Sequence, residues 1–355
     1  MDGSETFLYY ASKFNLKMDV QEKLELIKQN TEEILTEEDL LNLLKTKKKI
    51  SAYHGTAPTG PYHMAYLVPI GKMVELEKAG IKVKFLIANI HAALDDLKAP
   101  WEQIDKRGEY YKKCIELAFP WQTKPEFIFG SDFQLEKKYM LDVLKVSTLS
   151  TVKRATRAAS EVTRMKNPKV SELIYPIMQA MDEVGLDVDI QLGGIDQRHI
   201  LAFAREYLPK IGHKRRVEIM TPLIASLKGP GTKMSASIPM SHIKVYDSEV
   251  QIKAKLKGAY CLEGDTLENP VLQLCQFIIF PAKGKLKIER PAKFGGNIEF
   301  KSYKELETVF VDKQLHPGDL KPAVAAQLID IFKKARDYFD KNKDMLKELG
   351  QEFLP

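Results

Sequence analysis

The sequence predicts an α/β fold with a parallel sheet, followed by a mainly helical C-terminal region. Between residues 49 and 88, a strand-like run, a turn rich in Gly, Pro and Thr, a helical stretch and a second strand-like run follow one another, which is the order of a βαβ unit. Strand-like and helical segments keep alternating until Gly231, beyond which helical patterns dominate. The length of 355 residues exceeds the roughly 250 at which single cores usually divide, so two domains are expected.

The first 48 residues are expected to form an N-terminal extension and two short helices. Apolar residues recur at helical spacing from Val20 to Thr46, and Thr31 and Thr36, each with a glutamate nearby, are the expected N-caps. Residues 1–19 carry aromatic side chains without a clear period. We expect them to form an extension that either packs against the body or stays mobile.

The sheet is expected within residues 49–237. Segments with strand character are Lys49–His54, Val83–Ala88, Phe127–Phe129 and Asp187–Leu192, and segments with helical character are His63–Ala79, the basic Lys138–Lys166 and Ser171–Met181. The domain boundary is expected near Ser237–Ser241, so that residues 238–355 form the second domain. Units of this kind bind ligands at the carboxyl ends of their strands.

Composition limits the class of protein. Lys and Arg number 54 against 48 Asp and Glu, a net charge of +6 that permits a polyanionic partner without establishing one. The three cysteines, Cys114, Cys261 and Cys275, lack zinc-type spacing and the density of a disulfide scaffold, so we expect a reducing, cytoplasmic compartment and no disulfide-linked partner. Nothing in the sequence approaches the roughly 18 apolar residues of a membrane helix.

Two Gly-rich segments are candidates for phosphate binding. In Tyr53–Tyr66 a Gly-rich turn leads into a helix N-terminus, whose free NH groups and dipole suit a phosphate, and His63 could donate a hydrogen bond there. In Gly229–Ser237, small residues allow a mobile loop and Lys233 supplies a point charge. Taken singly, a plain tight turn and a solvated linker are the better explanations.

Together the two segments resemble the paired signatures of the class I aminoacyl-tRNA synthetases. Tyr175–Asp182 and Gly193–Arg198 further resemble blocks of the tyrosyl-tRNA synthetases, in the archaeal and eukaryotic branch, and the resemblance runs from about Leu24 to about Phe339. It implies a Rossmann-like catalytic domain with a helical insertion at about residues 131–170, used for dimerisation and acceptor-stem contact, and a mainly helical anticodon-binding domain. A homodimer is expected.

A pocket for tyrosine must be apolar around the ring and polar at its far end, because only hydrogen bonds to the hydroxyl reject phenylalanine, a selectivity for which tyrosyl-tRNA synthetases are the standard example. The resemblance assigns Tyr53 and Asp182 to the phenolic hydroxyl. It assigns the α-amino group to Tyr175, Gln179 and Gln197. The pocket wall is assigned to Leu86, Ala88, His91, Phe133 and Gln134. Tyr175, Gln179 and Asp182 also share one helical face, although a polar surface face would give the same spacing.

The resemblance assigns ATP to Gly55 and His63, to Gly194 and Asp196 at the adenosine and ribose, and to Lys233, Met234 and Ser235 at the triphosphate, with Mg²⁺ accompanying it. His63, Lys233 and Ser235 are the expected catalytic residues. Departures from the family pattern are Tyr66 in place of the second signature histidine, Ala236 in place of a second lysine, and Asn89 where relatives commonly have Asp.

The expected reaction joins the tyrosine carboxylate to the α-phosphate of ATP and then transfers the tyrosyl group to tRNA(Tyr), without a protein nucleophile. Positioning and charge stabilisation would supply the catalysis. The expected tRNA contacts are Lys153, Arg154, Arg157 and Arg164 in the insertion, and Phe294, His316 and Asp319 in the C-terminal domain. The alternatives are a solvated charge stripe for the basic residues and, on residue type alone, core packing for Phe294.

Three other functions are considered. A tryptophanyl-tRNA synthetase would share the fold, but Tyr53 with Asp182 favours a phenol over an indole. The presence of His63 and Lys233 argues against a catalytically silent RNA-binding paralogue. A general nucleotide-binding βαβ enzyme would not predict the C-terminal blocks.

Overall fold

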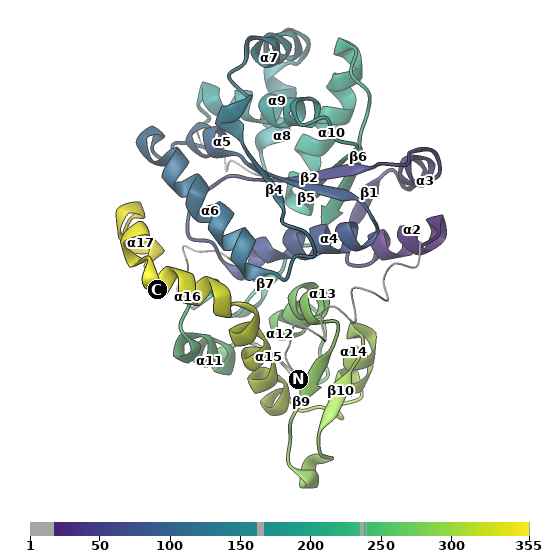
Figure 1. The fold of residues 1–355 in the computed structure, drawn as a ribbon, viewed down its shortest axis with the longest axis vertical. Coiled ribbons are helices and arrows are strands. Elements are labelled where there is room, and N and C mark those ends of the chain that lie inside the picture. Colours follow the sequence, from purple (N-terminus) through teal and green to yellow (C-terminus); the bar gives the residue numbers. More distant parts are fainter. Residues whose placement is uncertain (1–17, 162–166, 235–237, 239, 355) are drawn as a thin grey trace.

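A six-stranded sheet forms the centre of the molecule (Figure 1), whose computed structural model describes residues 18–161, 167–234, 238 and 240–354. The strand order is β1-β6-β5-β2-β3-β4, and neighbours are parallel except that β1 runs antiparallel to β6. The strands are β1 (Glu33–Leu35), β2 (Ser51–Thr56), β3 (Lys82–Ile87), β4 (Glu126–Phe129), β5 (Ile190–Gly194) and β6 (Val217–Thr221). The predicted α/β fold with a parallel sheet is confirmed, whereas β1 and β6 were not predicted.

Two N-terminal helices are present as expected, α2 (Val20–Lys28) and α3 (Glu37–Thr46). Thr36 caps α3 by accepting from the backbone NH of Asp39. The prediction for Thr31 is wrong: Asp19 caps α2, and the Thr31 hydroxyl donates to the Ile27 carbonyl at 2.7 Å. The chain after Thr31 forms β1 because its backbone pairs with β6, a long-range contact that local spacing does not reveal.

The first βαβ unit runs from β2 through η1 (Met64–Tyr66) and α4 (Leu67–Lys78) to β3. Helix α4 is buried along most of its length because it lies between the sheet and the C-terminal region. At Gly71 a Cβ atom would come within 2.6 Å of the Phe277 carbonyl, so glycine permits this close approach. Further along are α5 (Asn89–Leu94), η2 (Trp101–Gln103) and α6 (Ile104–Ala118).

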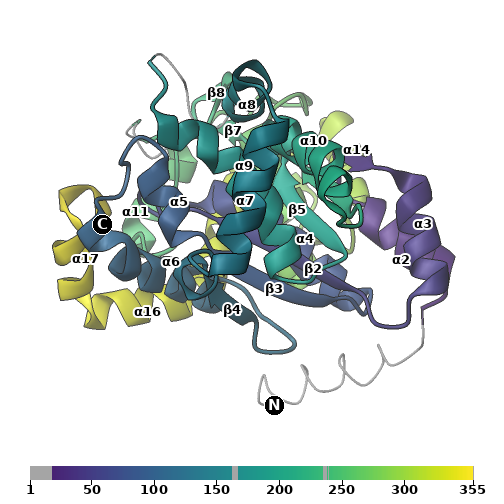
Figure 2. The same cartoon turned by 90° about the horizontal axis from the view of Figure 1, so that it is seen from above.

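Helices α7 to α10 cover the opposite side of the sheet (Figures 1 and 2). They are α7 (Lys137–Leu149), α8 (Val152–Ala159), α9 (Val170–Gly185) and α10 (Arg198–Tyr207), with the 3-10 turns η3 (Gly130–Asp132), η4 (Ile195–Gln197) and η5 (Leu208–Ile211). The basic region Lys138–Lys166, predicted as one helical region, is divided where Ser150 and Thr151 are extended, and Thr151 caps α8.

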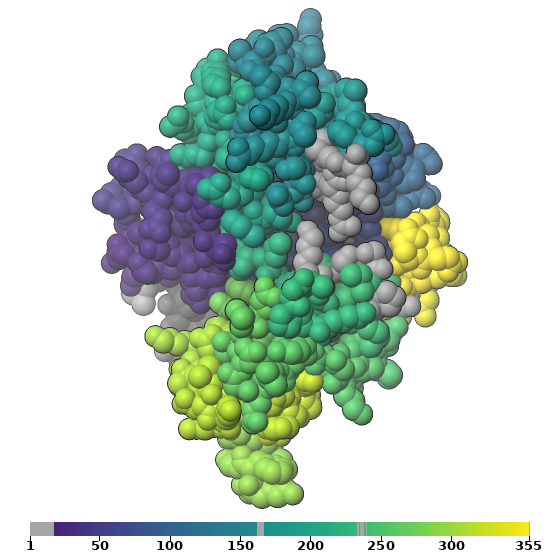
Figure 3. All heavy atoms as spheres, turned by 180° about the vertical axis from the view of Figure 1, so that it is seen from behind, coloured from purple at the N-terminus to yellow at the C-terminus, as the bar shows by residue number. Residues whose placement is uncertain are grey.

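Helices dominate the C-terminal region, as predicted. After the β7–β8 hairpin (Ala225–Ser226 and Gly229–Lys233) come α11 (Glu249–Gly258), α12 (Pro270–Leu274), the π-helix η6 (Cys275–Ile279), α13 (Phe280–Lys283), α14 (Tyr303–Val311), α15 (Pro317–Ile331), α16 (Lys333–Lys341), α17 (Lys343–Leu349) and η8 (Gln351–Phe353). A second hairpin, β9 (Leu286–Ile288) and β10 (Ile298–Phe300) around η7 (Ala292–Phe294), forms the tip of the molecule (Figure 3).

Residues 1–17 of the expected N-terminal extension lie outside the described residues, as do Arg164, Ser235, Ala236 and Ser237. All three cysteines are free. Within the described parts of the chain, no helix is both long and apolar enough to cross a membrane.

Candidate active site

A cavity of about 620 Å³ opens at the carboxyl ends of the parallel strands. Its lining includes the last residues of β2, Gly55 and Thr56, together with Gly194 at the end of β5 and Thr221 at the end of β6. This is the edge at which βαβ sheets bind ligands. The Gly-rich turn after β2 contributes Thr59 and its neighbours to the same lining.

Tyr53 and Asp182 both line this cavity, and they lie close enough to interact electrostatically. The Tyr53 side chain is fully buried on β2, and its hydroxyl donates to the Gln179 carbonyl at 3.5 Å. Asp182, on α9, accepts hydrogen bonds at Oδ1 from Gln134 Nε2 at 2.7 Å and from the Tyr139 hydroxyl at 2.8 Å. Two donors therefore fix the carboxyl group in the wall of the cavity.

Burial controls the charges around Asp182. It raises the pKa of Asp182 to about 7, against the opposing effect of the hydrogen bonds from Gln134 and Tyr139. Burial lowers the pKa of His91 to about 4, so this imidazole is neutral at pH 7; its Nε2 lies 3.9 Å from Asp182 Oδ2. The His91 ring meets Tyr175 edge-on, with centroids 4.6 Å apart. The region can thus accept a hydroxyl group within largely apolar walls.

The polar face predicted on the helix is present and points into the cavity. Tyr175, Gln179 and Asp182 all line it, and Gln179 Nε2 donates to Gln197 Oε1 at 2.9 Å. Helix α9 is mostly buried, which excludes the alternative of a polar surface face. The four side chains on this wall can bind a small molecule that has both an amino group and a hydroxyl group.

The predicted wall residues divide into two groups. Leu86, Ala88 and His91 line the cavity. Phe133 and Gln134 are not among the lining residues: Gln134 is fully buried and donates to Asp182, and Phe133 packs against the cluster of Tyr53 and Leu86, so their predicted contact with tyrosine stays a prediction. Both side chains support the cavity wall, because they contact residues that line the cavity: Asp182 for Gln134, and Tyr53 and Leu86 for Phe133.

His63 lines the same cavity. It is 5% exposed, precedes η1, and places its ring centroid 5.4 Å from that of His242. Burial, with a smaller contribution from His242, lowers the pKa of His63 to about 3, so the imidazole is neutral at pH 7. Its Nδ1 atom has no hydrogen-bond partner among the described residues and can donate to or accept from a ligand.

Three further predicted nucleotide contacts, Gly55, Gly194 and Asp196, line the cavity, as does Met234. A Cβ atom on Gly194 would come within 2.6 Å of Asp196 Oδ1, so glycine is needed beside this carboxylate. Lys233 ends β8. The prediction of a mobile loop over 229–237 is therefore wrong for its first five residues, which pair with β7.

The departures at residues 66 and 89 have local explanations. Tyr66 stacks on Tyr62 at 5.1 Å and lies 4.5 Å from the His63 ring, so an aromatic contact supports His63 where a second histidine would stand. Asn89 donates to Asp105 at 2.8 Å and accepts from the backbone NH of Ser131 at 3.0 Å. An aspartate at residue 89 could not donate to Asp105, and two carboxylates would repel each other there.

Sequence reasoning missed several residues of the site. Tyr139, which holds Asp182, lies on the buried face of α7 with Asp142, Val143 and Val146, and this i, i+3, i+4, i+7 spacing was a usable signal. Arg107 and Glu352 also line the cavity, and Arg107 donates to the Thr59 carbonyl at 3.2 Å. Glu352 is far from the other lining residues in sequence, and it reaches the cavity only through the folding of the C-terminal region.

The predicted RNA contacts lie apart from the cavity. Lys153 and Arg157 are exposed on α8, whereas Arg154 pairs with Glu206 at 2.8 Å and covers the Phe203 ring. Phe294 is 55% exposed on η7, so the core packing expected from its residue type is wrong.

Two C-terminal candidates lie at the start of α15. Exposed His316 caps α15 by accepting the backbone NH of Gly318 at 2.9 Å, and Asp319 is in the first turn. The hairpin's Arg290 donates to the Gln314 carbonyl at 3.0 Å, so the hairpin is joined to the segment that precedes His316.

Comparisons with known proteins agree with this architecture. The family model described as "tRNA synthetases class I (W and Y)" matches residues 45–333. Tyrosine–tRNA ligase of Methanococcoides burtonii is 44% identical over 320 residues, which cover 90% of this chain and 100% of that protein. The cytoplasmic tyrosine–tRNA ligase of Gallus gallus is 40% identical, with 94% and 64% covered.

Solved structures give the same result. The tyrosyl-tRNA synthetase of Archaeoglobus fulgidus, complexed with L-tyrosine, superposes with a TM-score of 0.86 at 42% identity and covers 90% of this chain and 99% of that one. Tryptophanyl-tRNA synthetase from Giardia lamblia gives a TM-score of 0.68 at 17% identity, with 96% and 91% covered, which indicates a shared fold alone.

Proposed function

The chain belongs to the tyrosine–tRNA ligases among the class I tRNA synthetases, and we propose that it activates L-tyrosine with ATP and transfers the tyrosyl group to tRNA(Tyr) in the cytoplasm. The observation that carries this proposal is that Tyr53, Asp182 and His63 line one cavity. A phenol bound at one end would therefore share the cavity with a nucleotide at the other.

Tyrosine would place its hydroxyl between Tyr53 and Asp182. The Asp182 carboxylate, already oriented by Gln134 and Tyr139, would accept a hydrogen bond from the phenolic hydroxyl, and Tyr53 would complete the site for the oxygen. Tyr175, Gln179 and Gln197 would receive the α-amino group, and Leu86, Ala88 and neutral His91 would enclose the ring. Phenylalanine would leave these buried polar groups unpaired, which is unfavourable.

ATP would occupy the other end of the cavity. Gly55, Gly194 and Asp196 are suited to the adenosine because glycine allows close approach and a carboxylate accepts from ribose hydroxyls. The tyrosine carboxylate attacks the α-phosphate, forming tyrosyl-adenylate as pyrophosphate leaves. His63 would hydrogen-bond to a phosphate oxygen, and we assign Lys233, Met234 and Ser235 to the triphosphate from the family signature.

Mg²⁺ would enter with the phosphates of ATP. Among the described residues no three His, Cys, Asp or Glu side chains converge on a point that could hold a metal ion. The oxygen ligands that Mg²⁺ prefers would therefore come mainly from the nucleotide and from water.

Transfer RNA would bridge the two domains, with the catalytic domain at residues 49–237 and the anticodon-binding domain at residues 238–355. Lys153, Arg154 and Arg157 would face the acceptor stem, since basic side chains bind phosphates. Exposed Phe294 at the hairpin tip would stack on an anticodon base, with His316 and Asp319 nearby.

A homodimer would form through the inserted helices of residues 131–170. Helix α7 buries one face and exposes Leu141 and Leu144, and Leu135 and Val152 beside it are exposed as well. Exposed large apolar side chains concentrated on one element are typical of a protein interface.

The decisive experiment is amino-acid-dependent exchange of labelled pyrophosphate into ATP, run with each standard amino acid in turn. We expect exchange with tyrosine alone. Exchange with tryptophan alone would identify the tryptophanyl enzyme, and absence of exchange with every amino acid would favour a silent RNA-binding paralogue.

A further inference from the structure

The C-terminal segment of residues 351–354 lies against the catalytic domain, and Glu352 lines the active-site cavity. In Figure 3 the last residues, in yellow, lie directly beside the residues of α5 and α6, in blue. The Phe353 side chain is fully buried; its ring meets Tyr110 edge-on at 5.3 Å, and the Arg107 guanidinium lies 5.0 Å above it. The buried aromatic ring therefore anchors residues 351–354 to the body of the molecule.

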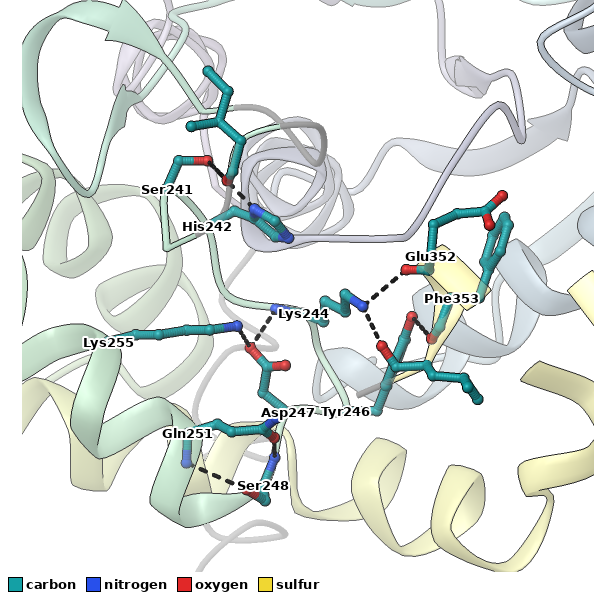
Figure 4. Close-up of polar contacts among 12 residues, drawn as sticks. Ser241, His242, Lys244, Tyr246, Asp247, Ser248, Gln251, Lys255, Glu352 and Phe353 are labelled. Atoms are coloured by element: carbon teal, nitrogen blue, oxygen red, sulfur yellow. Dashed lines mark hydrogen bonds and ion pairs between the residues drawn. The ribbon is translucent and has the colours of Figure 1, made fainter. Parts of the chain in front are cut away.

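Residues 241–247, which we call the strap, hold this segment through its main chain (Figure 4). Lys244 Nζ donates to the Glu352 carbonyl at 2.9 Å and also to the Leu354 carbonyl. The Tyr246 hydroxyl donates to the Phe353 carbonyl at 2.8 Å. Three consecutive carbonyl groups of the C-terminal segment therefore accept hydrogen bonds from two side chains of the strap.

The same strap is paired with His63. His63 and Lys244 form an antiparallel bridge, and the backbone NH of Met64 donates to the Ile243 carbonyl at 2.9 Å. At its other end the strap is fixed to α11, since the Asp247 carboxylate accepts hydrogen bonds from Lys255 and from the backbone NH of Lys244 (Figure 4). The strap thus connects the C-terminal segment to the backbone that carries His63.

A second connection runs through two buried hydroxyl groups. The backbone NH of Tyr62 donates to the Tyr110 hydroxyl at 2.7 Å, Tyr110 donates to the Tyr246 hydroxyl at 3.0 Å, and Tyr246 donates to the Phe353 carbonyl. A carbonyl can only accept, so Phe353 fixes the direction of the whole series. Removing this carbonyl would leave the buried Tyr246 hydroxyl, two hydrogen bonds from the Tyr62 NH, without its acceptor, which is costly.

We propose that residues 351–354 are a positioning element for the nucleotide end of the active site. They fix the strap and Tyr62, and through both they hold His63 in place. The inference rests on the proposed function in assigning ATP to His63. Tyr53 and Asp182 have no hydrogen bond to this network among the described residues, so its loss should impair the ATP-dependent step and spare tyrosine binding.

The test compares the full chain with a chain truncated after Gln351, with Phe353→Ala and with Tyr246→Phe. Lys347→Ala is the control, because Lys347 is exposed on α17 and bonds only to its neighbour Asp344 among the contacts described. In tyrosine-dependent pyrophosphate exchange, we expect kcat/KM for ATP to fall at least about tenfold in the truncated chain. The Kd for tyrosine, measured by equilibrium dialysis, should stay within about twofold.

Hydrogen exchange supplies a readout that does not depend on activity. The amides of Tyr62 and Met64 should exchange faster in the truncated chain and in Tyr246→Phe than in the full chain and the control. If the full chain itself catalyses no exchange of pyrophosphate, the proposed function is rejected, and the amide rates alone decide the positioning role.

Two results would overturn the inference. One is unchanged protection of Tyr62 and Met64 together with an unchanged kcat/KM for ATP. The other is an equal loss of tyrosine affinity and ATP-dependent turnover that follows a lower Tm, because this would indicate a general contribution to stability.

Discussion

At the scale of single residues, the site combines groups whose protonation is set by burial. Asp182 has a pKa raised to about 7, and His91 and His63 have pKa values lowered to about 4 and about 3. At pH 7.5 the cavity therefore presents a carboxylate to a phenol and neutral imidazoles to the ring and to the phosphates. Of these three groups, Asp182 has the pKa nearest to neutral pH.

Asp182→Asn should reduce the preference for tyrosine over phenylalanine. Losing a hydrogen bond to a charged group costs about 1.5–3 kcal/mol, or roughly 10- to 100-fold in the ratio of kcat/KM values for the two amino acids. In the unmodified chain, the KM for tyrosine should rise as the pH falls from 8 to 6, because protonation of Asp182 removes the acceptor; this rise should be absent in Asp182→Asn.

Pyrophosphate exchange at both pH values measures these effects, and Asp187→Asn, at an exposed carboxyl group nearby, is the matched control. An unchanged preference in Asp182→Asn would refute the role of Asp182.

His63→Ala should slow adenylate formation by about 10²–10³-fold, because it removes a hydrogen bond to a phosphate oxygen that strengthens in the transition state. Lys233→Ala should act in the same direction. Tyrosine binding should change little in either variant. Single-turnover kinetics and equilibrium dialysis separate the two quantities, with His213→Ala, outside the cavity, as the control. Equal loss in rate and in tyrosine affinity would contradict these assignments.

The residues that could be predicted are those whose types carry chemistry in a fixed local spacing. Tyr175, Gln179 and Asp182 occupy one helical face, and His63 follows a Gly-rich turn. Gln134 contacts Asp182 and does not itself line the cavity, because a resemblance indicates which residues surround a pocket and not how deeply each is buried. Glu352 could not be foreseen, since its place depends on the packing of the whole C-terminal region.

At the scale of elements, the strands and helices with strong periodicity were predicted well, and the short or paired elements were missed. β1 consists of three half-buried residues without a clear alternation, and it is a strand because its backbone pairs with β6. β8 is made of Gly, Pro, Thr and Lys, a composition typical of loops, and it is a strand because β7 supplies its hydrogen bonds. Local composition does not reveal which distant strand a segment will pair with.

Helix α7 should mediate self-association. Leu144→Arg places a charge on an apolar side chain that is 60% exposed, so burying this face in a dimer would become unfavourable. Sedimentation should give a dimer for the unmodified chain and a monomer for this variant. Val250→Arg, at an apolar residue of α11 that is 77% exposed, should remain dimeric. A monomeric unmodified chain would contradict the prediction.

Phe294→Ala, at the tip of the β9–β10 hairpin, should weaken tRNA binding. Stacking of a base on an aromatic ring contributes about 1–3 kcal/mol, so the KM for tRNA in aminoacylation should rise roughly 5- to 150-fold while pyrophosphate exchange is unchanged. Leu267→Ala, at another exposed apolar residue of the C-terminal region, is the control. A loss that is equal in exchange and in aminoacylation would instead indicate a defect in folding.

At the scale of the whole molecule, two buried carboxyl groups make stability depend on pH. Glu183 and Glu218 are fully buried, and none of their oxygens has a hydrogen-bond partner among the described residues. Burial raises the pKa of Glu183 to about 8 and that of Glu218 well above its usual range, against the attraction of Arg216. The folded state therefore retains protons that the unfolded state releases.

This linkage predicts the effect of Glu183→Gln. A carboxyl group with a raised folded-state pKa stabilises the fold below its unfolded value of about 4.5 and loses that contribution as the pH rises through about 8. The Tm of Glu183→Gln should therefore exceed that of the unmodified chain by a margin that grows from pH 5 to pH 8.5. Calorimetry measures the margin, and exposed Glu348→Gln should show none. A margin independent of pH would refute this account.

The antiparallel strand β1 has a consequence for solubility. Residues 33–35 pair with Met220, Ile219 and Glu218, whose backbone groups would otherwise be unpaired along one edge of the sheet. An exposed edge strand of this kind can pair with strands of other molecules and so start aggregation. The two N-terminal helices and the short strand between them therefore act as a built-in protection against fibrous self-assembly, a task separate from anything that takes place in the cavity.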